Sequence, residues 1–248
     1  MNIPPGLEEE LNKYIFSTWD KDVLASPEGQ AGKRAVLIDR LNDALTYVVP
    51  WMQAFIDLKN STIVEVGCGS GSSTVALAMN SKYIYGYDID SNIISAAKAR
   101  LRAYDLDNAV VNHCSPETEI ARISTIPDAN VFVFYAVLEH MTIQERIAIL
   151  AETWKMMRPG SYLVIIETPN RLVWFDSHSS HLEFFHLLPD ELAFLYMYKI
   201  PRRDYRDSLL ASQDKSLTRT RWGMGARFHE VETALQTDPN PNAVPNGP

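Results

Sequence analysis

The sequence has little cysteine and no excess of positive charge, and both deficits limit what the protein can be. Its 248 residues include two cysteines, Cys68 and Cys114, and these do not have the spacing of a metal-binding pair. We therefore expect a reduced, cytoplasmic protein without structural disulfides. The 31 acidic and 23 basic side chains give a net charge of −8. That sign disfavours a broad nucleic-acid surface and an anionic membrane as partners.

Long apolar runs are also missing. No stretch approaches the roughly 20 apolar residues of a membrane-spanning helix. The first residues, MNIPPGLEEEL, have neither the basic nor the apolar segment of a secretory signal, so we expect no signal peptide here. The sequence thus predicts no membrane partner.

The spacing of apolar residues divides the chain into four regions. Residues 1–60 predict a helical cap, with a break at 26–32 and a break or kink at Pro50. Residues 61–170 alternate short β-rich runs with helical ones, which predicts an α/β core with a doubly wound, mostly parallel sheet and helices on both faces. We expect residues 171–235 to form a lid or substrate segment and the end of the core. The Pro- and Asn-rich residues 236–248 predict a disordered tail.

The stretch IVEVGCGSGSST, residues 63–74, places three glycines directly after the first predicted strand. Gly67, Gly69 and Gly71 stand where nucleotide-like ligands bind in open α/β sheets. Glycine there permits a positive φ and a close approach of backbone to ligand, and the following helix offers unpaired N–H groups. A dinucleotide fingerprint would need a glycine where Ser72 stands.

With Glu65 the stretch reads E-x-G-x-G-x-G, and it resembles the class I S-adenosylmethionine (SAM)-dependent methyltransferases. Two further motifs support the resemblance: L-E-H at 138–140 after the fourth predicted strand, and R-P-G at 158–160 before the fifth. Both recur in members that act on small molecules. The resemblance covers roughly residues 61–170. It implies a Rossmann-like fold, S-adenosyl-L-methionine as cofactor and S-adenosylhomocysteine as product.

The resemblance also implies which residues hold the cofactor. The glycine backbone lies against the methionine part, Glu65 helps to hold the loop and the amino end, and Asp88 accepts the ribose hydroxyls. We assign Asp90 instead to the cap of the next helix. The family often has an acid after the third strand that reaches adenine, but Cys114 stands there in this sequence. The residues expected to contact SAM are Glu65, Gly67, Cys68, Gly69, Gly71, Asp88, Ile89, Cys114, Ser115 and Tyr135.

Motifs that are missing from the sequence limit which molecules can be the methyl acceptor. After the fourth strand the sequence reads YAVL, where enzymes that methylate amines of nucleic acids or glutamine commonly have N-P-P-Y or D-P-P-Y. The Pro-Cys pair of cytosine-C5 enzymes is absent as well. A small molecule is therefore the expected substrate. The fifth strand ends in ETPNR, which resembles small-molecule O-methyltransferases and implies O-methylation by in-line displacement.

Three histidines are candidate catalytic bases, because a hydroxyl must lose its proton to be methylated. They are His178, His181 and His140; His186 is a weaker candidate. Aromatic residues around them either stack on a flat substrate or anchor a lid to the sheet. His178 and His181, with Glu167 or Asp176, form too incomplete a ligand set for a metal, so we expect none.

Two other functions stay open. The family's sheet normally ends with a strand pair, and residues 200–248 show no clean pair of alternating strands. Either residues 217–222 and 226–235 form a distorted pair, or the sheet is truncated, in which case a homodimer is possible. The unusual tail and the missing acid after the third strand are the grounds for the first alternative, a non-catalytic or partner-dependent SAM-binding module. A NAD(P)-dependent reductase is the other alternative, although no Tyr-x-x-x-Lys pair is placed for hydride transfer.

Overall fold

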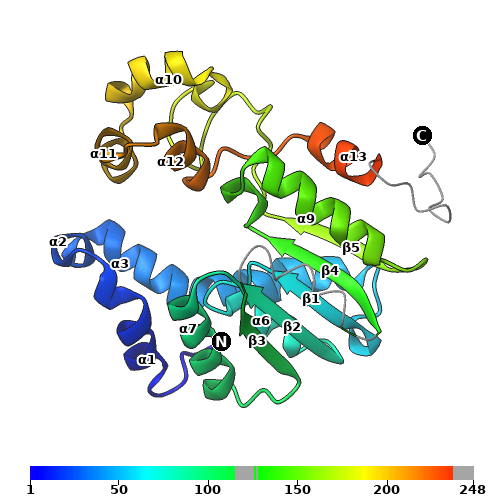
Figure 1. Ribbon diagram of the computed structural model, residues 1–248. Helices are drawn as coiled ribbons and strands as arrows, with labels where there is room; N and C mark the ends of the chain where they lie inside the picture. Colours follow the sequence, from blue (N-terminus) through cyan, green and yellow to red (C-terminus); the bar gives the residue numbers. More distant parts are fainter. Residues whose placement is uncertain (115–125, 127, 237–248) are drawn as a thin grey trace. The chain divides into compact units, whose positions relative to one another are not determined.

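The computed structural model describes residues 1–114, 126 and 128–236 (Figure 1). Ser115 and residues 237–248, most of the predicted tail, lie outside the described residues. The chain forms two compact units. The first contains residues 1–135 and 160–164, and the second contains residues 136–159 together with those from 165 onward.

The first unit is built on a five-stranded sheet with the strand order β3-β2-β1-β4-β5. β1 pairs in parallel with both β2 and β4, and β2 pairs in parallel with β3. The order reverses between β1 and β4, which is where α/β sheets bind ligands beyond the carboxyl ends of their strands. The doubly wound fold is therefore confirmed. The strands are β1 Thr62–Val66, β2 Tyr83–Asp88, β3 Ala109–His113, β4 Ala129–Tyr135 and β5 Tyr162–Ile166.

Strand β1 lies at the centre of this sheet. All five of its residues are buried, as expected for a strand covered by helices on both sides. The helices after β1 and β2 are α6 Ser72–Ala78 and α7 Ser91–Ala103. The Asp90 carboxylate accepts hydrogen bonds from the N–H groups of Asn92 and Ile93, so its predicted role as a helix cap is confirmed.

The N-terminal region is helical as predicted, but the break predicted at residues 26–32 is wrong. Residues 26–32 largely form α3, because Ser26 caps this helix and Pro27 occupies its first turn, where no N–H donor is needed. Pro50 does not end a helix either, because it lies in the first turn of α5 after a π-helical turn. The elements are α1 Leu7–Tyr14, η1 Phe16–Thr18, α2 Lys21–Ala25, α3 Pro27–Arg34, η2 Ala35–Asp39, α4 Arg40–Asp43, η3 Ala44–Val48, α5 Val49–Gln53 and η4 Leu58–Asn60.

The second unit is mostly helical. A capping box between Thr142 and Glu145 starts α9, and α13 packs against α9 with a buried ion pair between Arg146 and Glu230. A separate core around Phe185 joins α10 and α11. The elements are η5 Leu138–His140, α9 Ile143–Met156, η6 Phe185–Leu187, α10 Asp190–Tyr196, η7 Met197–Lys199, α11 Arg203–Ala211, α12 Lys215–Arg221 and α13 Phe228–Gln236.

The predicted distorted strand pair does not form in the described part of the tail. Residues 217–222 lie mostly in α12 and residues 226–235 mostly in α13. The sheet of the described residues therefore ends at β5. None of the helices in the described ranges is long and apolar enough to cross a membrane.

Candidate active site

The glycine loop after β1 adopts a backbone that suits glycine. Gly67, Gly69 and Gly71 have φ values of 74°, 51° and 80°, in the left-handed region that other residues rarely adopt. A Cβ on Gly71 would lie 3.1 Å from the Cβ of Ala97, whereas a Cβ on Gly69 would meet nothing within 4 Å. Gly71 therefore allows close packing on α7. The backbone at Gly69 faces open space that a ligand can use.

Glu65 presents a buried acceptor beside this loop. One carboxylate oxygen accepts a 2.6 Å hydrogen bond from the Thr74 hydroxyl, while Oε1 has no hydrogen-bond partner. Burial raises the pKa of Glu65 to about 7, opposed by hydrogen bonds from Ser73 and Thr74. The contact between Ser73 and the Glu65 carboxylate is weak, because Oε1 forms no hydrogen bond with any described residue. A buried acceptor without a donor fits the amino group of the expected cofactor.

Asp88 holds the loop and keeps capacity for a ligand. Its Oδ2 accepts from the Gly69 N–H at 2.9 Å, and its Oδ1 accepts from the Asp90 N–H at 3.0 Å. A carboxylate has about four acceptor positions, so both oxygens can still bind ribose hydroxyls. The neighbouring Ile89 is 59% exposed, and the Cys114 N–H donates to the Asp88 carbonyl at 3.1 Å. These residues thus meet at the carboxyl ends of β1, β2 and β3.

Cys68 is a buried packing residue in this loop. Burial raises the pKa of its thiol well above the ordinary value, and the charges of Glu65 and Asp88 raise it further. A thiol held neutral is a poor nucleophile. Tyr135 ends β4 in the same unit and is partly buried. Of the ten predicted contact residues, Ser115 alone lies outside the described residues.

Arg100 supports the loop from behind, and the sequence did not predict it. Its buried guanidinium donates to the carbonyls of Ser70 at 2.8 Å, Leu37 at 2.9 Å and Val36 at 2.7 Å. Burial lowers its pKa to about 10. The side chain thereby joins the glycine loop to the N-terminal helices. An arginine in an amphipathic helix is ordinarily exposed, so the sequence carries no signal for this role.

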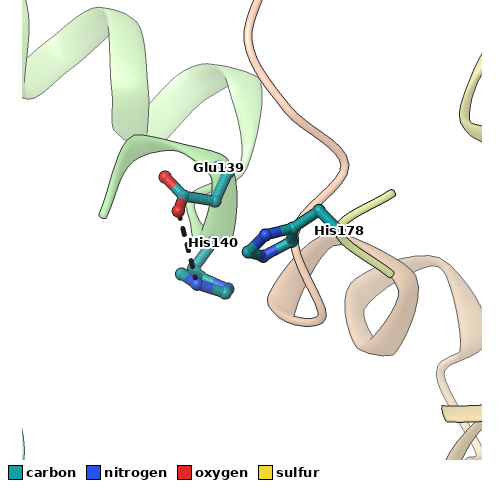
Figure 2. Close-up of side chains that lie close together, drawn as sticks. All are labelled: Glu139, His140 and His178. Carbon is teal, nitrogen blue, oxygen red and sulfur yellow. Dashed lines mark ion pairs between the residues drawn. The ribbon is translucent and has the colours of Figure 1, made fainter. Parts of the chain in front are cut away.

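In the second unit, Glu139, His140 and His178 form a cluster (Figure 2). The rings of His140 and His178 have centroids 5.5 Å apart, so two of the three candidate bases lie together. Glu139, which the sequence analysis did not select, is fully buried, and burial is the main cause that raises its pKa to about 7. Its Oε1 lies 3.7 Å from Nε2 of His140. The L-E-H motif was the available signal for its position.

Gly223 makes room for His178. A Cβ at this position would lie 2.4 Å from Cδ2 and 2.5 Å from Nε2 of His178, and the φ of Gly223 is 98°. Any other residue here would displace the ring. The G-M-G sequence at 223–225 was the available signal for such a backbone.

His181 and Asp176 do not join the cluster. The Asp176 carboxylate accepts from the N–H and hydroxyl groups of both Ser179 and Ser180. Burial alone would raise the pKa of Asp176, but these hydrogen bonds lower it. His181 is exposed. His178 therefore lies beside Glu139 and His140 rather than in a set with His181 and Asp176.

Two pockets lie within the second unit. The first, of about 230 Å³, has Arg171, Phe175, His178 and His186 in its wall. The second, of about 410 Å³, shares Arg171 with the first. Burial lowers the pKa of Arg171 to about 10, as do Arg227 and other nearby arginines.

The aromatic residues of this unit differ in their burial. Phe185 is buried in the core and anchors the segment, whereas Trp174 and Phe184 are more than half exposed. Phe175 lines the first pocket. The segment therefore supplies both an anchor and a pocket wall.

Comparison with known proteins finds a methyltransferase domain. Residues 64–163 match the family described as Methyltransferase domain. The chain is 28% identical to ribosomal protein L11 methyltransferase of Legionella pneumophila (strain Paris) over 53% of this chain and 44% of that protein. It is 39% identical to ribosomal RNA small subunit methyltransferase A of Mesomycoplasma hyopneumoniae (strain 232), over 21% of this chain and 20% of that one.

Solved structures include magnesium protoporphyrin IX methyltransferase from Synechocystis with bound SAM. It is 15% identical, with a TM-score of 0.43, over 66% of this chain and 80% of that chain. The present chain spans less than half of the length of the curated relatives named above. The matched residues include the glycine loop, strands β2, β3 and β4, and parts of β1 and β5. Residues 64–163 therefore match a methyltransferase domain, in agreement with the resemblance of the glycine loop to SAM-dependent methyltransferases, whose cofactor is S-adenosyl-L-methionine.

Proposed function

We propose that the chain transfers the methyl group of SAM to a hydroxyl oxygen of a small molecule by in-line displacement. One observation supports this most strongly. His178 belongs both to the cluster with Glu139 and His140 and to the wall of the 230 Å³ pocket. A concave site with a few polar groups suits a small ligand. Within one compact unit, the chain thus offers a place for an acceptor beside groups that can take up its proton.

The division of labour follows from the chemistry. Bound SAM supplies an electrophilic methyl group on its sulfonium. Glu65 and Asp88 are the side chains proposed to hold it. The chain must then orient the acceptor and remove the hydroxyl proton, because a neutral hydroxyl is a weak nucleophile. We assign orientation to the pocket wall, including Phe175, and proton removal to the cluster around His178.

The acceptors named for the relatives differ from this proposal, since they include a ribosomal protein and ribosomal RNA. The net charge of −8 disfavours RNA. We therefore propose neither a nucleic-acid nor a membrane partner.

The protein is proposed to be cytoplasmic, because Cys68 and Cys114 are thiols rather than members of a disulfide. A homodimer is proposed as a way to cover the β5 edge of the described sheet.

A partner-dependent SAM-binding module is the second candidate. The observation in its favour is the helical tail, since α12 and α13 stand where the resemblance implies closing strands. Such a module would bind SAM normally and would methylate no small molecule by itself.

The test is to incubate the chain and SAM with the ultrafiltered metabolites of a cell extract. We expect one compound to gain a methyl group in a chain-dependent manner, detected by mass spectrometry. The NMR chemical shift of the added methyl group then shows whether it is attached to oxygen or to nitrogen. SAM affinity measured on the same sample separates the two candidates: binding without any methylated product supports the partner-dependent module.

A further inference from the structure

The cluster of Glu139, His140 and His178 joins donors from two distant segments of the second unit. One ligand atom from each residue lies within 4.8 Å of the other two. Figure 2 shows the His178 ring directed toward His140 and Glu139. Two imidazole nitrogens and one carboxylate oxygen are the ligands that divalent transition metals bind in catalytic sites.

The hydrogen bonds of the cluster direct two acceptors toward each other. Nδ1 of His140 lies 2.8 Å from the Arg221 carbonyl, and since a carbonyl only accepts, Nδ1 carries the proton. The lone pair of the neutral ring is then on Nε2, which faces Oε1 of Glu139 at 3.7 Å. That distance is too long for a hydrogen bond. Oε1 has no hydrogen-bond partner among the described residues, although Glu139 is fully buried. A cation bound at this point would provide the buried Oε1 with a partner.

A second layer of contacts fixes the orientation of the ligands. A metal-bound histidine usually donates its other N–H to a carbonyl or carboxylate, and the Arg221 carbonyl has that position. Arg221 is itself held by Glu145 at 2.6 Å. Gly223, which has no side chain, leaves the space that the His178 ring occupies. The His140 side chain is 40% exposed, so a coordination position stays open to solvent or substrate.

The distances suit one ion. Ligand atoms at about 2.1 Å from a common ion lie roughly 3.0 to 4.2 Å from one another. The pair of Glu139 and His140, at 3.7 Å, is already within this range. The other separations are at most 4.8 Å, about 0.6 Å beyond the upper end of this range.

We propose that Glu139, His140 and His178 bind one divalent transition metal ion of the Zn²⁺, Co²⁺ and Mn²⁺ class. The binding itself does not depend on the proposed function. Its role rests on that function: an acceptor hydroxyl coordinated at the open position loses its proton to solvent more readily, and its oxygen is then the nucleophile. With the ion bound, the cluster promotes proton removal through its ligands, in place of the direct proton uptake by histidine that the metal-free cluster would provide.

Metal binding is tested on the full chain after removal of metals with a chelator. We expect one Co²⁺ per chain, with the visible absorption of a low-coordinate Co²⁺ site, and competition by Zn²⁺. His140→Ala, His178→Ala and Glu139→Gln should each weaken Co²⁺ binding by more than about tenfold. His229→Ala is the matched control, because this exposed histidine of the same unit stacks on Phe228 outside the cluster. Circular dichroism of every variant shows whether it is folded.

Gly223→Ala provides a second test that keeps all three ligands. Its Cβ displaces the His178 ring, so Co²⁺ binding should weaken as in His178→Ala. Absence of Co²⁺ binding by the folded wild type, or binding unchanged in His140→Ala and His178→Ala, overturns the metal site. Methyl transfer that proceeds equally with and without the metal overturns its catalytic role and leaves the proposed function intact.

Discussion

Gly223 and the His178 ring lie so close together that a Cβ on Gly223 would be 2.5 Å from Nε2 of His178. The relationship joins a turn late in the chain to a histidine in the aromatic segment. It explains why a glycine with a φ of 98° is needed at this turn. The position of His178 in the cluster therefore depends on a residue that has no side chain of its own.

Replacing Gly223 with alanine should reduce methyl transfer with little effect on SAM binding. The displaced His178 leaves the cluster, and loss of proton removal costs about 100-fold in kcat. SAM affinity should stay within about twofold, because the proposed cofactor residues belong to the first unit. Steady-state kinetics and calorimetry measure the two effects. Equal turnover in Gly223→Ala and wild type would show that the ring position is irrelevant to the reaction.

Asp88→Asn should weaken binding of both SAM and S-adenosylhomocysteine by about tenfold or more. The substitution removes an anionic acceptor for the ribose hydroxyls and weakens the 2.9 Å bond from the Gly69 N–H. Calorimetry with both ligands measures the loss. Asp90→Asn is the matched control, since asparagine caps a helix nearly as well as aspartate and the Asp90 side chain contacts α7 rather than the loop. Equal affinities for the two variants would remove Asp88 from the cofactor site.

Glu65 should make the ligand-free protein less stable as the pH rises. Its pKa is about 7 in the folded protein and 4.5 ordinarily, so the folded state binds the proton more tightly than the unfolded chain. The stabilisation is complete below pH 4.5 and is lost as the pH rises to about 7, with a total of about 3 kcal/mol. Urea unfolding across this range should show that loss in wild type relative to Glu65→Gln. Parallel curves for the two proteins would contradict the raised pKa.

Arg100→Met should lower the free energy of unfolding by about 3 kcal/mol, because three carbonyls lose a charged donor in a buried place. Urea denaturation measures the change. Arg102→Met is the control, since Arg102 is exposed on the same helix and its replacement should change stability by less than about 0.5 kcal/mol. Similar losses for the two variants would mean that the contacts to Ser70, Leu37 and Val36 contribute little.

The core of the fold was predictable because its signals are local. Strands such as Tyr162–Ile166 are continuous apolar runs, and the glycines after β1 need a special backbone whatever the rest of the chain does. The helix in place of the predicted break at 26–32 was missed because Ser26 and Pro27 act there as a cap and a first turn, and both residues are also common in loops.

The cluster in the second unit was only partly predictable. His178 and His181 are close in sequence, but Asp176 binds the intervening serines and His178 lies beside His140. Contacts between residues so distant in sequence depend on tertiary packing. For the same reason no local pattern pointed to Arg100, whose three partners lie on two other segments.

The identity of the methyl acceptor is the central claim, and the fate of a labelled methyl group tests it most directly. The chain is incubated with methyl-labelled SAM and a whole-cell extract, and the label is then counted in the small-molecule, RNA and protein fractions. The small-molecule acceptor proposed here predicts that chain-dependent label appears in the small-molecule fraction and is strongly reduced with His178→Ala. Label recovered in RNA or protein, with none in small molecules, would contradict it.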